Sequence, residues 1–561
     1  MPKESNMHMI RRRMMRILAT TLVLLLVGVF LSSCSKTPTT SMVPAREKII
    51  RVDQSWPCHI DPAVGMDNAA DIAVVNLYDT LVKVGDNNIP QPEAAKSWDY
   101  DQATDTYTFH LNTGIKFHAG GELTASDVVF SLNRLITIGQ GYSYLFKRIV
   151  ATCKALDPQT VQISLKQPYG PFLVIVPHLC ILSEKEVMAH IKADGPYGSF
   201  GDYGTDWLVT HDAGSGPYMV KEMKTAESLT CIRFPDYWQG WDPAAPDTFQ
   251  ELAANEPVTV RTLMSRQQLE ISDEWQPAEN YTAMSQIPGV EVTRFLTGAI
   301  LNLSFNTSRP PLDDIHFRRA LVYSFDYATC RTLFPGSSPT NGPVGSGLPG
   351  WNSSSPTMEQ DMEKAKAELK LSKYKSDLGK YPVEFDWVAE VPDEEKVALL
   401  MQFDCAELGI KINVVKTPWL TAIANTAKAN TSPMIFAQIK TSIAYPEAGA
   451  LLENAYSSAG IGTYSACHWF TSAVQSDLDK KINDTMKTMD PATRYEKYKI
   501  LTDTIVNLAS DMVCCEVAQR HAYQAGYLDW PAADHAKAGE KVNVMPSYRM
   551  YFRDFRFITG K

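Results

Sequence analysis

The stretch that decides the fold runs from Tyr78 to Leu135 and reads YDTLVKVGDNNIPQPEAAKSWDYDQATDTYTFHLNTGIKFHAGGELTASDVVFSLNRL. Near its middle, Thr106–Leu111 alternates between polar and apolar side chains, which predicts a half-buried strand. Turn residues follow at Asn112–Gly114, and the period of two resumes at Ile115 and Phe117. We therefore expect a hairpin at this point of the chain.

The end of the stretch has the pattern of a helix start. Thr124 and Asp127 resemble a capping box, with Asp at the position where Glu or Gln is preferred. Val128, Leu132 and Leu135 then lie on one helical face. A strand, a turn and a capped helix are scaffold features, so they predict structure and identify no chemistry by themselves.

This order of segments resembles the signature region of the family 5 extracellular solute-binding proteins, the oligopeptide, dipeptide and nickel receptors of ABC importers. The matching segments are Y-x-x-L-V, Pro-Glu-Ala-Ala-x-Ser-Trp, Tyr-Thr-Phe-His-Leu, Gly-Ile-Lys-Phe-His and Leu-Thr-Ala-Ser-Asp-Val-Val-Phe-Ser. Further matching segments lie at 214–218, 234–238, 303–321, 341–350, 477–482 and 494–498. The resemblance therefore covers nearly all of residues 47–561.

The resemblance implies an α/β fold: a two-lobed periplasmic-binding-protein-like fold of type II, with an extra subdomain and two interlobe crossovers. We expect the crossovers near Gly298 and near Cys515, and two crossovers make a hinge that can close over a ligand. The expected parts are a lipoprotein signal peptide (1–33), a flexible tether (34–46), lobe I (47–75, 217–298 and 516–561), the extra subdomain of lobe I (76–216) and lobe II (299–515).

Patterns in the second half of the chain agree with an α/β lobe. Val383–Val388 alternates as a strand, and Glu395–Leu408 has the composition of a helix that stops at Gly409. A second strand is expected at Ile410–Val415, directly after that stop. Helices that alternate with strands in this way are typical of α/β architecture.

The N-terminus has the features of an exported, lipid-anchored protein. Arginines at 11–13 and 16 precede the apolar segment Ile17–Leu31, which is short for a membrane span and suits a signal-peptide core. Leu31-Ser-Ser-Cys34 resembles a lipobox, so we expect Cys34 to be lipidated and the protein to be extracytoplasmic, lipid-anchored to the cell membrane or to the periplasmic face of the envelope. The alternative is a plain transmembrane anchor with an incidental cysteine.

Composition and charge indicate which classes of protein and binding partner fit this chain. Hydrophobic residues make up 45% of the chain, which is ordinary for a globular protein. The net charge of −10 disfavours binding to nucleic acid or to anionic membrane surfaces. Ten cysteines are present, and with Cys34 lipidated an odd number remains, so at least one thiol stays unpaired. Disulfide connectivity is open, but adjacent Cys514 and Cys515 in an apolar run favour two buried thiols.

One segment of the chain bears directly on the ligand. In peptide-binding relatives a Trp-x-Ala-Asp-Tyr-x-Asp/Glu-Pro segment lines the cleft, and its first Asp pairs with the α-amino group of the peptide. In this chain the resemblance places Tyr445 and Glu447 on that pattern, but Ala444 stands at the amine-pairing position. An ammonium group taken out of water needs a paired charge. Either Glu447 or another carboxylate takes the amine, or the ligand has no free amine.

Other residues fall near positions where the resemblance expects the cleft: Trp419, His468, Trp469, Asp61 and Asn68. Aromatic side chains and neutral hydrogen-bonding groups would also suit a sugar. An oligosaccharide, another non-peptide solute such as an opine, or a nickel chelate therefore remains an alternative ligand. The eleven histidines contain no i, i+4 pair, so no metal site and no cofactor is predicted from the residues.

The sequence lacks the motifs of common enzymes. No G-x-S-x-G, H-E-x-x-H or G-x-x-x-x-G-K-[ST] occurs, and the single G-x-G-x-x-G, at Gly345–Gly350, lies between prolines in a predicted loop. We therefore expect a non-enzyme, with a secreted hydrolase as the alternative of a different class and a surface adhesin as a third. The expected function is capture of a peptide-like solute by a monomeric receptor that delivers it to ABC permease and ATPase subunits on separate chains.

Overall fold

The computed structural model describes residues 46–54, 59–86, 88–254, 256–441 and 444–558. The predicted signal peptide, Cys34 and all of the predicted tether except Arg46 lie outside these residues. The described residues from Lys48 onward form one compact unit. No helix among the described residues is both long enough and apolar enough to cross a membrane.

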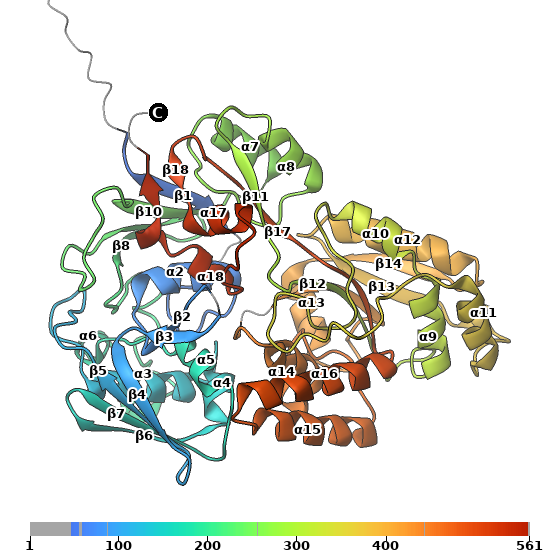
Figure 1. Ribbon diagram of the computed structural model, residues 1–561, viewed down its shortest axis with the longest axis horizontal. Helices are drawn as coiled ribbons and strands as arrows, with labels where there is room; N and C mark the ends of the chain where they lie inside the picture. The colour runs from blue at the N-terminus through green and yellow to red at the C-terminus, as the bar shows by residue number, and fades with distance from the viewer. Residues whose placement is uncertain (1–45, 55–58, 87, 255, 442–443, 559–561) are drawn as a thin grey trace, which may run out of the picture. The chain divides into compact units, whose positions relative to one another are not determined.

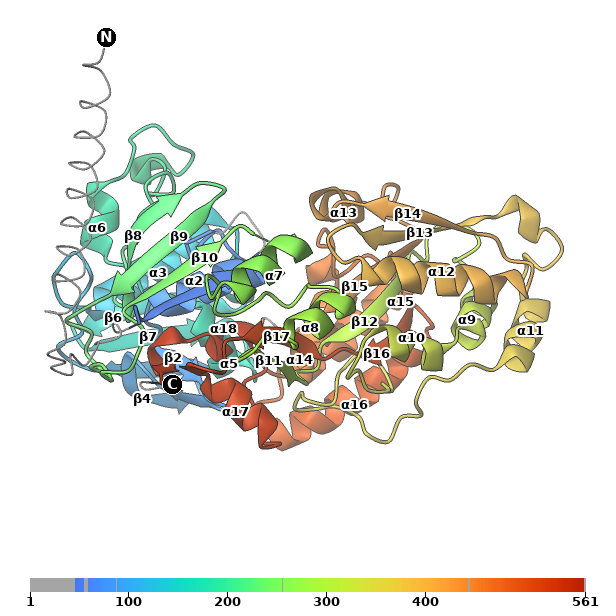
Figure 2. The ribbon, with the colours of Figure 1, turned by 90° about the horizontal axis from the view of Figure 1, so that it is seen from above.

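One sheet combines the start of the chain with strands from its middle. Its order is β1-β10-β9-β8, and β1 runs parallel to β10 while the other pairs are antiparallel. Figure 2 shows β8, β9 and β10 side by side. The strands are β1 (Ile49–Asp53), β8 (Tyr218–Lys224), β9 (Ser228–Arg233) and β10 (Thr248–Leu252).

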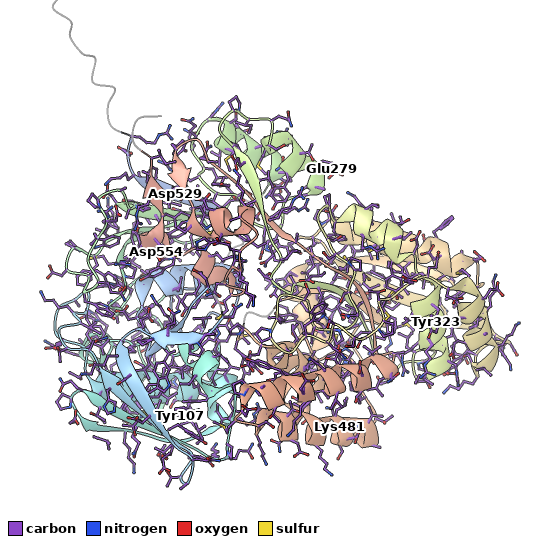
Figure 3. All side chains as sticks on the ribbon, viewed as in Figure 1. Tyr107, Glu279, Tyr323, Lys481, Asp529 and Asp554 are labelled. Atoms are coloured by element: carbon purple, nitrogen blue, oxygen red, sulfur yellow. The ribbon has the colours of Figure 1, made fainter. Side chains whose placement is uncertain are left out.

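A second, wholly antiparallel sheet is built within residues 95–165, in the order β4-β5-β7-β6. Tyr107 and Phe109 on β5 are buried against Phe172 and other apolar residues of the main core, because they occupy the inward-facing positions of the alternating strand. Figure 3 labels Tyr107 on this sheet. The strands are β4 (Ala95–Asp101), β5 (Thr106–Leu111), β6 (Val150–Asp157) and β7 (Thr160–Leu165), with a short ribbon of β2 (Val82–Val84) and β3 (Pro90–Pro92).

A third, mixed sheet has the order β14-β13-β15-β12-β16. Its parallel pairs are β13 with β14 and with β15, whereas β12 is antiparallel to both of its neighbours. One face carries apolar residues such as Leu301, Leu303 and Phe385, which pack into a separate core. The strands are β12 (Ile300–Phe305), β13 (Val383–Val388), β14 (Ile412–Thr417), β15 (Ile435–Lys440) and β16 (Asp511–Glu516).

The chain changes sheets twice at adjacent points. It leaves β11 (Glu291–Phe295) for β12, and later leaves β16 for β17 (Gln519–Tyr523), which pairs with β11. The two crossing segments are bonded to each other, since Val517 N donates to Ala299 O at 2.8 Å and Gly298 N donates to Glu516 Oε1 at 3.2 Å. The sheet changes lie at the expected crossovers near Gly298 and Cys515, while the lobe boundaries themselves stay predictions.

The helices cover these sheets (Figure 1). Helices α14, α15 and α16 pack against one another, and their apolar residues share the main core with residues of 76–216. The helices are α2 (Asn68–Leu77), α3 (Ala125–Ile138), α4 (Ser143–Lys147), α5 (Phe172–Ile175), α6 (Glu184–Ala189), α7 (Pro257–Ser265), α8 (Ala278–Met284), α9 (Ile315–Ser324), α10 (Tyr327–Leu333), α11 (Met362–Leu371), α12 (Asp393–Ala406), α13 (Trp419–Thr426), α14 (Ala448–Tyr456), α15 (Ser472–Met486), α16 (Pro491–Asn507), α17 (Pro531–Lys537) and α18 (Pro546–Arg549).

Several local predictions can be compared with the structure directly. The strand at Thr106–Leu111, the capping box of Thr124 with Asp127 before α3, and the free, buried thiols of Cys514 and Cys515 are confirmed. The expected hairpin is wrong, because β5 pairs with β4 and β7 and the chain after Leu111 does not pair with it. Local alternation identifies a strand but does not identify the partner that its edges bond to.

Candidate ligand-binding site

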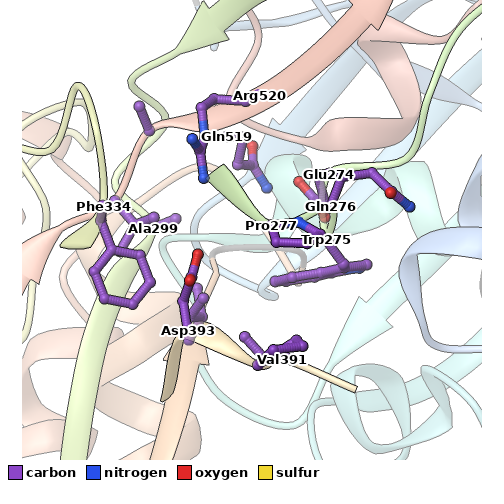
Figure 4. A pocket seen from close by; sticks show the side chains of 14 residues that line it. Glu274, Trp275, Gln276, Pro277, Ala299, Phe334, Val391, Asp393, Gln519 and Arg520 are labelled. Atoms are coloured by element: carbon purple, nitrogen blue, oxygen red, sulfur yellow. The ribbon is translucent and has the colours of Figure 1, made fainter. Parts of the chain in front are cut away.

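A cavity lies where the two crossing segments meet. Its walls come from residues 274–277 before α8, Ala299 before β12, Phe334 after α10, residues 391–393 at the start of α12, Ile439 of β15 and residues 517–520 leading into β17. The space between these side chains is about 480 Å³, part of which is open to solvent. In Figure 4, Trp275 and Phe334 lie on opposite sides of this space. Pockets at junctions of this kind are common ligand sites.

The backbone before the cavity is held tightly by strands on both sides. Ile271 forms bridges with Val52 of β1 and with Tyr523 of β17. Ser272 adds two more bonds to β17, because its N–H donates to Ala522 O at 2.8 Å and its hydroxyl accepts from Ala522 N at 2.9 Å. This fixed backbone sets the position at which the Glu274 side chain enters the cavity wall.

Glu274 is a buried carboxylate with an unused oxygen. The residue is 9% exposed, and its Oε1 accepts from Asn68 Nδ2 at 3.1 Å. Its Oε2 has no hydrogen-bond partner among the described residues, and neither does Oδ1 of Asn68. Burial raises the pKa of Glu274 to about 7, and the charge of Asp273 adds to this rise while Arg549 opposes it.

Gln519 offers a donor on the same cavity. Its Oε1 accepts from Thr297 Oγ1 at 2.8 Å and from Arg549 Nη2, which fixes the orientation of the amide. Its Nε2 is buried and has no partner within the part of the chain that the structure describes. Arg549 itself is buried, which lowers its pKa to about 10.

Two further charged side chains line the cavity. The guanidinium of Arg520 lies over the ring of Tyr281, with 4.6 Å between its Cζ and the ring centroid. Burial lowers the pKa of Arg520. Asp393 pairs with Lys396, whose Nζ lies 2.8 Å from Asp393 Oδ1. The cavity wall therefore contains both a carboxylate and a guanidinium, which suits a solute with groups of both signs.

A second cavity lies beside α2 and is lined by residues of that helix and of neighbouring segments. Asp71 lines it and accepts from the Tyr142 hydroxyl at 2.7 Å. Tyr142 in turn stacks on His178, with ring centroids 3.7 Å apart. Burial raises the pKa of Asp71 well above its ordinary value. Because this carboxylate already has a donor within the chain, the second cavity is the weaker candidate.

The carboxylate of Glu447 accepts its hydrogen bonds from side chains of the protein itself. It accepts from Arg494 Nε at 3.0 Å, from Arg494 Nη2 at 2.7 Å and from the Tyr498 hydroxyl at 3.1 Å. Glu447 and Arg494 are both buried. Its neighbours Ala444 and Tyr445 are buried in the main core, and the Tyr445 hydroxyl donates to Glu453 Oε2 at 3.3 Å.

His468 and Trp469 lie beside a buried polar cluster on the third sheet. His468 Nε2 lies 2.8 Å from Asp511 Oδ1 and forms a hydrogen bond with it. Burial alone would raise the pKa of Asp511, but the charges of His468 and Lys440 lower it far below its usual range. Trp469 has a φ of 53°, and its indole Nε1 is buried without a partner among the described residues. A strained aromatic residue with an unused donor is typical of functional positions.

The remaining predicted residues have partners of their own. Asp61 accepts from Arg134 Nη1 at 2.7 Å and from Arg134 Nη2 at 2.6 Å, and the pair is buried. Trp419 begins α13 and meets Tyr464 edge to face, with ring centroids 4.9 Å apart. None of the predicted residues that the structure describes lines the cavity, although Asn68 bonds to Glu274. Their roles as ligand contacts therefore stay predictions.

Glu274, Gln519 and Arg520 were not predicted from the sequence as site residues. The signal available at Glu274 is an acidic pair, Asp273-Glu274, directly before Trp275 and Pro277. Gln519 and Arg520 carry no such signal, because polar residues on an alternating strand are usually solvent-exposed. No group of three His, Cys, Asp or Glu side chains suited to a metal ion occurs among the described residues.

Comparison with known proteins places the chain in a family. Residues 90–463 match the bacterial extracellular solute-binding proteins, family 5 Middle. The probable D,D-dipeptide-binding periplasmic protein DdpA of Escherichia coli is 28% identical over 373 residues, which cover 64% of this chain and 68% of the relative. Heme-binding protein A of Haemophilus influenzae is 25% identical over 379 residues, with coverage of 61% and 65%.

Solved structures show the same fold. The periplasmic binding protein DppA of Helicobacter pylori, in complex with the peptide STSA, has a TM-score of 0.76 at 19% identity and covers 91% of this chain and 98% of its own. The protein AgaA in complex with agropinic acid, from A. tumefaciens R10, has a TM-score of 0.73 at 18% identity, with coverage of 91% and 99%. The predicted two-lobed periplasmic-binding-protein-like fold is thereby confirmed, and the chain belongs to the bacterial extracellular solute-binding proteins, family 5.

Proposed function

We propose that this protein captures a peptide-like solute in the cavity at the two crossing segments, closes over it and delivers it to the permease of an ABC importer. Membership of the family identifies an extracytoplasmic substrate-binding protein rather than an enzyme. The observation that carries the proposal is the cavity itself, which has polar groups without partners among the described residues on its wall, at the point where the chain passes twice between sheets. Hinge closure at such crossings is a standard motion of binding proteins.

The names of similar proteins support a peptide as the first ligand. Relatives include the dipeptide-binding protein of Escherichia coli, and the similar DppA structure holds a peptide. A non-peptide solute is the second candidate, because Ala444 supplies no carboxylate and the indole donor of Trp469 is unused among the described residues. The similar structures include one with agropinic acid and one with Ni(L-His).

A thermal-shift panel on a protein that starts near Arg46 tests the ligand class. The panel contains di- to pentapeptides, oligosaccharides, an opine and nickel with histidine. A ligand at 100 times its Kd stabilises the folded state by about 2.7 kcal/mol, which gives a measurable rise in Tm. A rise with peptides supports the proposal, and a rise only with sugars or with the nickel chelate would replace the peptide as ligand.

Small-angle scattering tests closure, because the radius of gyration should fall at saturating ligand.

The membrane attachment is proposed from the lipobox alone. Acylation at Cys34 would hold the protein at the membrane, because each buried CH₂ group contributes about 0.8 kcal/mol and several chains give stable attachment. Mass spectrometry of the full-length protein from its host should show acyl chains that the Cys34→Ala variant lacks. Acyl chains on that variant would rule out the lipobox assignment.

A further inference from the structure

We propose that Glu274, together with Asn68, binds a primary ammonium group of the solute, and that Gln519 binds a carbonyl oxygen next to it. The solute class is therefore one with a free N-terminal amino group beside an amide or carboxyl carbonyl. This inference rests on the proposed function, because it assigns roles to Glu274 and Gln519 on the wall of the same cavity and to Asn68, which bonds to Glu274. It requires no carboxylate at position 444, where the chain has Ala444.

The chemistry of the unused atoms defines the missing partner. When Glu274 is ionised, its Oε2 and Asn68 Oδ1 are both acceptors, and both lack a donor among the described residues. The amide of Asn68 is oriented by its own bond to Glu274, because a flipped amide would set its oxygen against the carboxylate. A buried acceptor without a donor destabilises the folded protein. A group with several N–H donors would satisfy both oxygens at once, and an ammonium has three.

Charge favours a cation over a neutral donor at this position. Glu274 is buried, and among the described residues its carboxylate bonds to the neutral amide of Asn68 and to no cation. Asp273 lies close enough to raise the pKa of Glu274 further, while the cation that lowers it is Arg549. Arg549 donates its hydrogen bonds elsewhere, to the carbonyl oxygens of Asn543 and Val544 and to Gln519. A bound ammonium would therefore be the first cation in direct contact with this carboxylate.

Gln519 provides a second contact for the solute, to the carbonyl oxygen next to the ammonium group. Its orientation is fixed by Thr297 and Arg549, so its Nε2–H groups are the part of the amide that remains for a ligand. Glu274 and Gln519 line the same cavity. An acceptor and a donor on the cavity wall, with Asn68 bonded to Glu274 behind the acceptor, match an ammonium followed by a carbonyl oxygen. A hydroxyl-rich sugar offers no cation to this site, so the site discriminates between the two ligand classes.

The test compares peptides with and without a free amine. Titration calorimetry measures the Kd of a mixed dipeptide pool and of the same pool after N-acetylation, on the wild-type protein, on Glu274→Gln and on Glu251→Gln. Glu251 is a matched control because it is a buried carboxylate on β10 that does not line the cavity. We expect acetylation to weaken wild-type binding at least tenfold, Glu274→Gln to weaken binding of the free pool by a similar factor, and Glu251→Gln to bind like the wild type.

Each outcome separates the two proposals. Free-pool binding that is unchanged in Glu274→Gln, or acetylated peptides that bind the wild type equally well, would overturn the ammonium site and leave the peptide receptor intact. Absence of binding by either pool to folded wild-type protein would overturn the proposed ligand class and this inference with it. The melting curve of each free variant is recorded first. Asn68→Ala serves as a second variant if Glu274→Gln fails to fold, with the same expected direction.

Discussion

Arg494 donates from Nε and Nη2 to the two carboxylate oxygens of Glu447, at 3.0 and 2.7 Å. Arg494 lies on α16, and Glu447 directly precedes α14. This ion pair thus joins α14 to α16, two of the helices that share the main core with residues of 76–216. The carboxylate that the resemblance placed on the ligand segment is used to fix that segment in place.

Glu447→Gln should therefore lower the stability of the folded protein but leave its affinity for the solute nearly unchanged. Removing one partner of a buried ion pair leaves an uncompensated charge and costs about 3 kcal/mol or more. We expect a clear fall in Tm, while the Kd for a dipeptide pool, measured well below that Tm, stays close to that of the wild type. A large loss of affinity in folded Glu447→Gln protein would return Glu447 to the solute site.

Contacts around Glu453 join α14 to residues of 76–216, and we expect them to contribute to solute affinity through the proposed closure. Glu453 accepts from the Tyr169 hydroxyl at 2.9 Å and from Arg148 Nη2. Arg148→Ala removes the charged partner of Glu453. Because Arg148 is partly exposed, we expect the variant to weaken solute binding by about 1 kcal/mol or less. The measurement is the Kd for the solute at low and high salt. Lys147→Ala is the matched control, because it removes the neighbouring positive charge and leaves the contact with Glu453 intact; an equal effect in both variants would rule out a specific contact.

Gly298 should be required at the first crossing segment. Its φ is 80°, and a Cβ at this position would meet Leu348 Cγ at 2.8 Å. Gly298→Ala therefore adds a steric conflict to the strain of a left-handed backbone, which alone costs about 1–2 kcal/mol. We expect a larger fall in Tm than for Gly120→Ala. Gly120 has a φ of 89°, and no described atom lies within 4 Å of the place that its Cβ would take, so this control measures backbone strain alone. Equal falls would show that Leu348 adjusts.

Local patterns predicted much of the fold, and long-range pairing was the part they missed. The strand Val383–Val388 matches β13, because alternation depends on neighbours in the chain. The partners of β5 were missed, since a strand's edge bonds are made to residues far away in sequence. The sheet changes near Gly298 and Cys515 came from the family resemblance and not from periodicity.

The ligand site was predictable only in part, for a similar reason. Asn68 was predicted as a ligand contact, and the structure bonds it to Glu274, which lies 206 positions later. No pattern within either segment predicts that contact. Glu447 shows the opposite case, because its place in a ligand-like motif gives no indication of the buried guanidinium that pairs with it.

Glu274 should make both stability and ligand binding depend on pH. Its folded pKa of about 7 lies above the ordinary value of 4.5, so the folded state holds a proton that the unfolded state has released between these values. Stability from this group is therefore full below about pH 4.5 and falls by about 3 kcal/mol as the pH rises through 7. Unfolding of the free protein by urea from pH 4.5 to 8 should show this fall relative to Glu274→Gln, which cancels the contribution of other buried carboxylates.

Dipeptide binding should release protons for the same reason. An ammonium ligand stabilises the ionised form of Glu274, so binding at pH 7 should release about half a proton per molecule, measured by calorimetry in buffers of different ionisation enthalpy. Proton release that persists in Glu274→Gln would assign it to another group and contradict the contact between Glu274 and the amine.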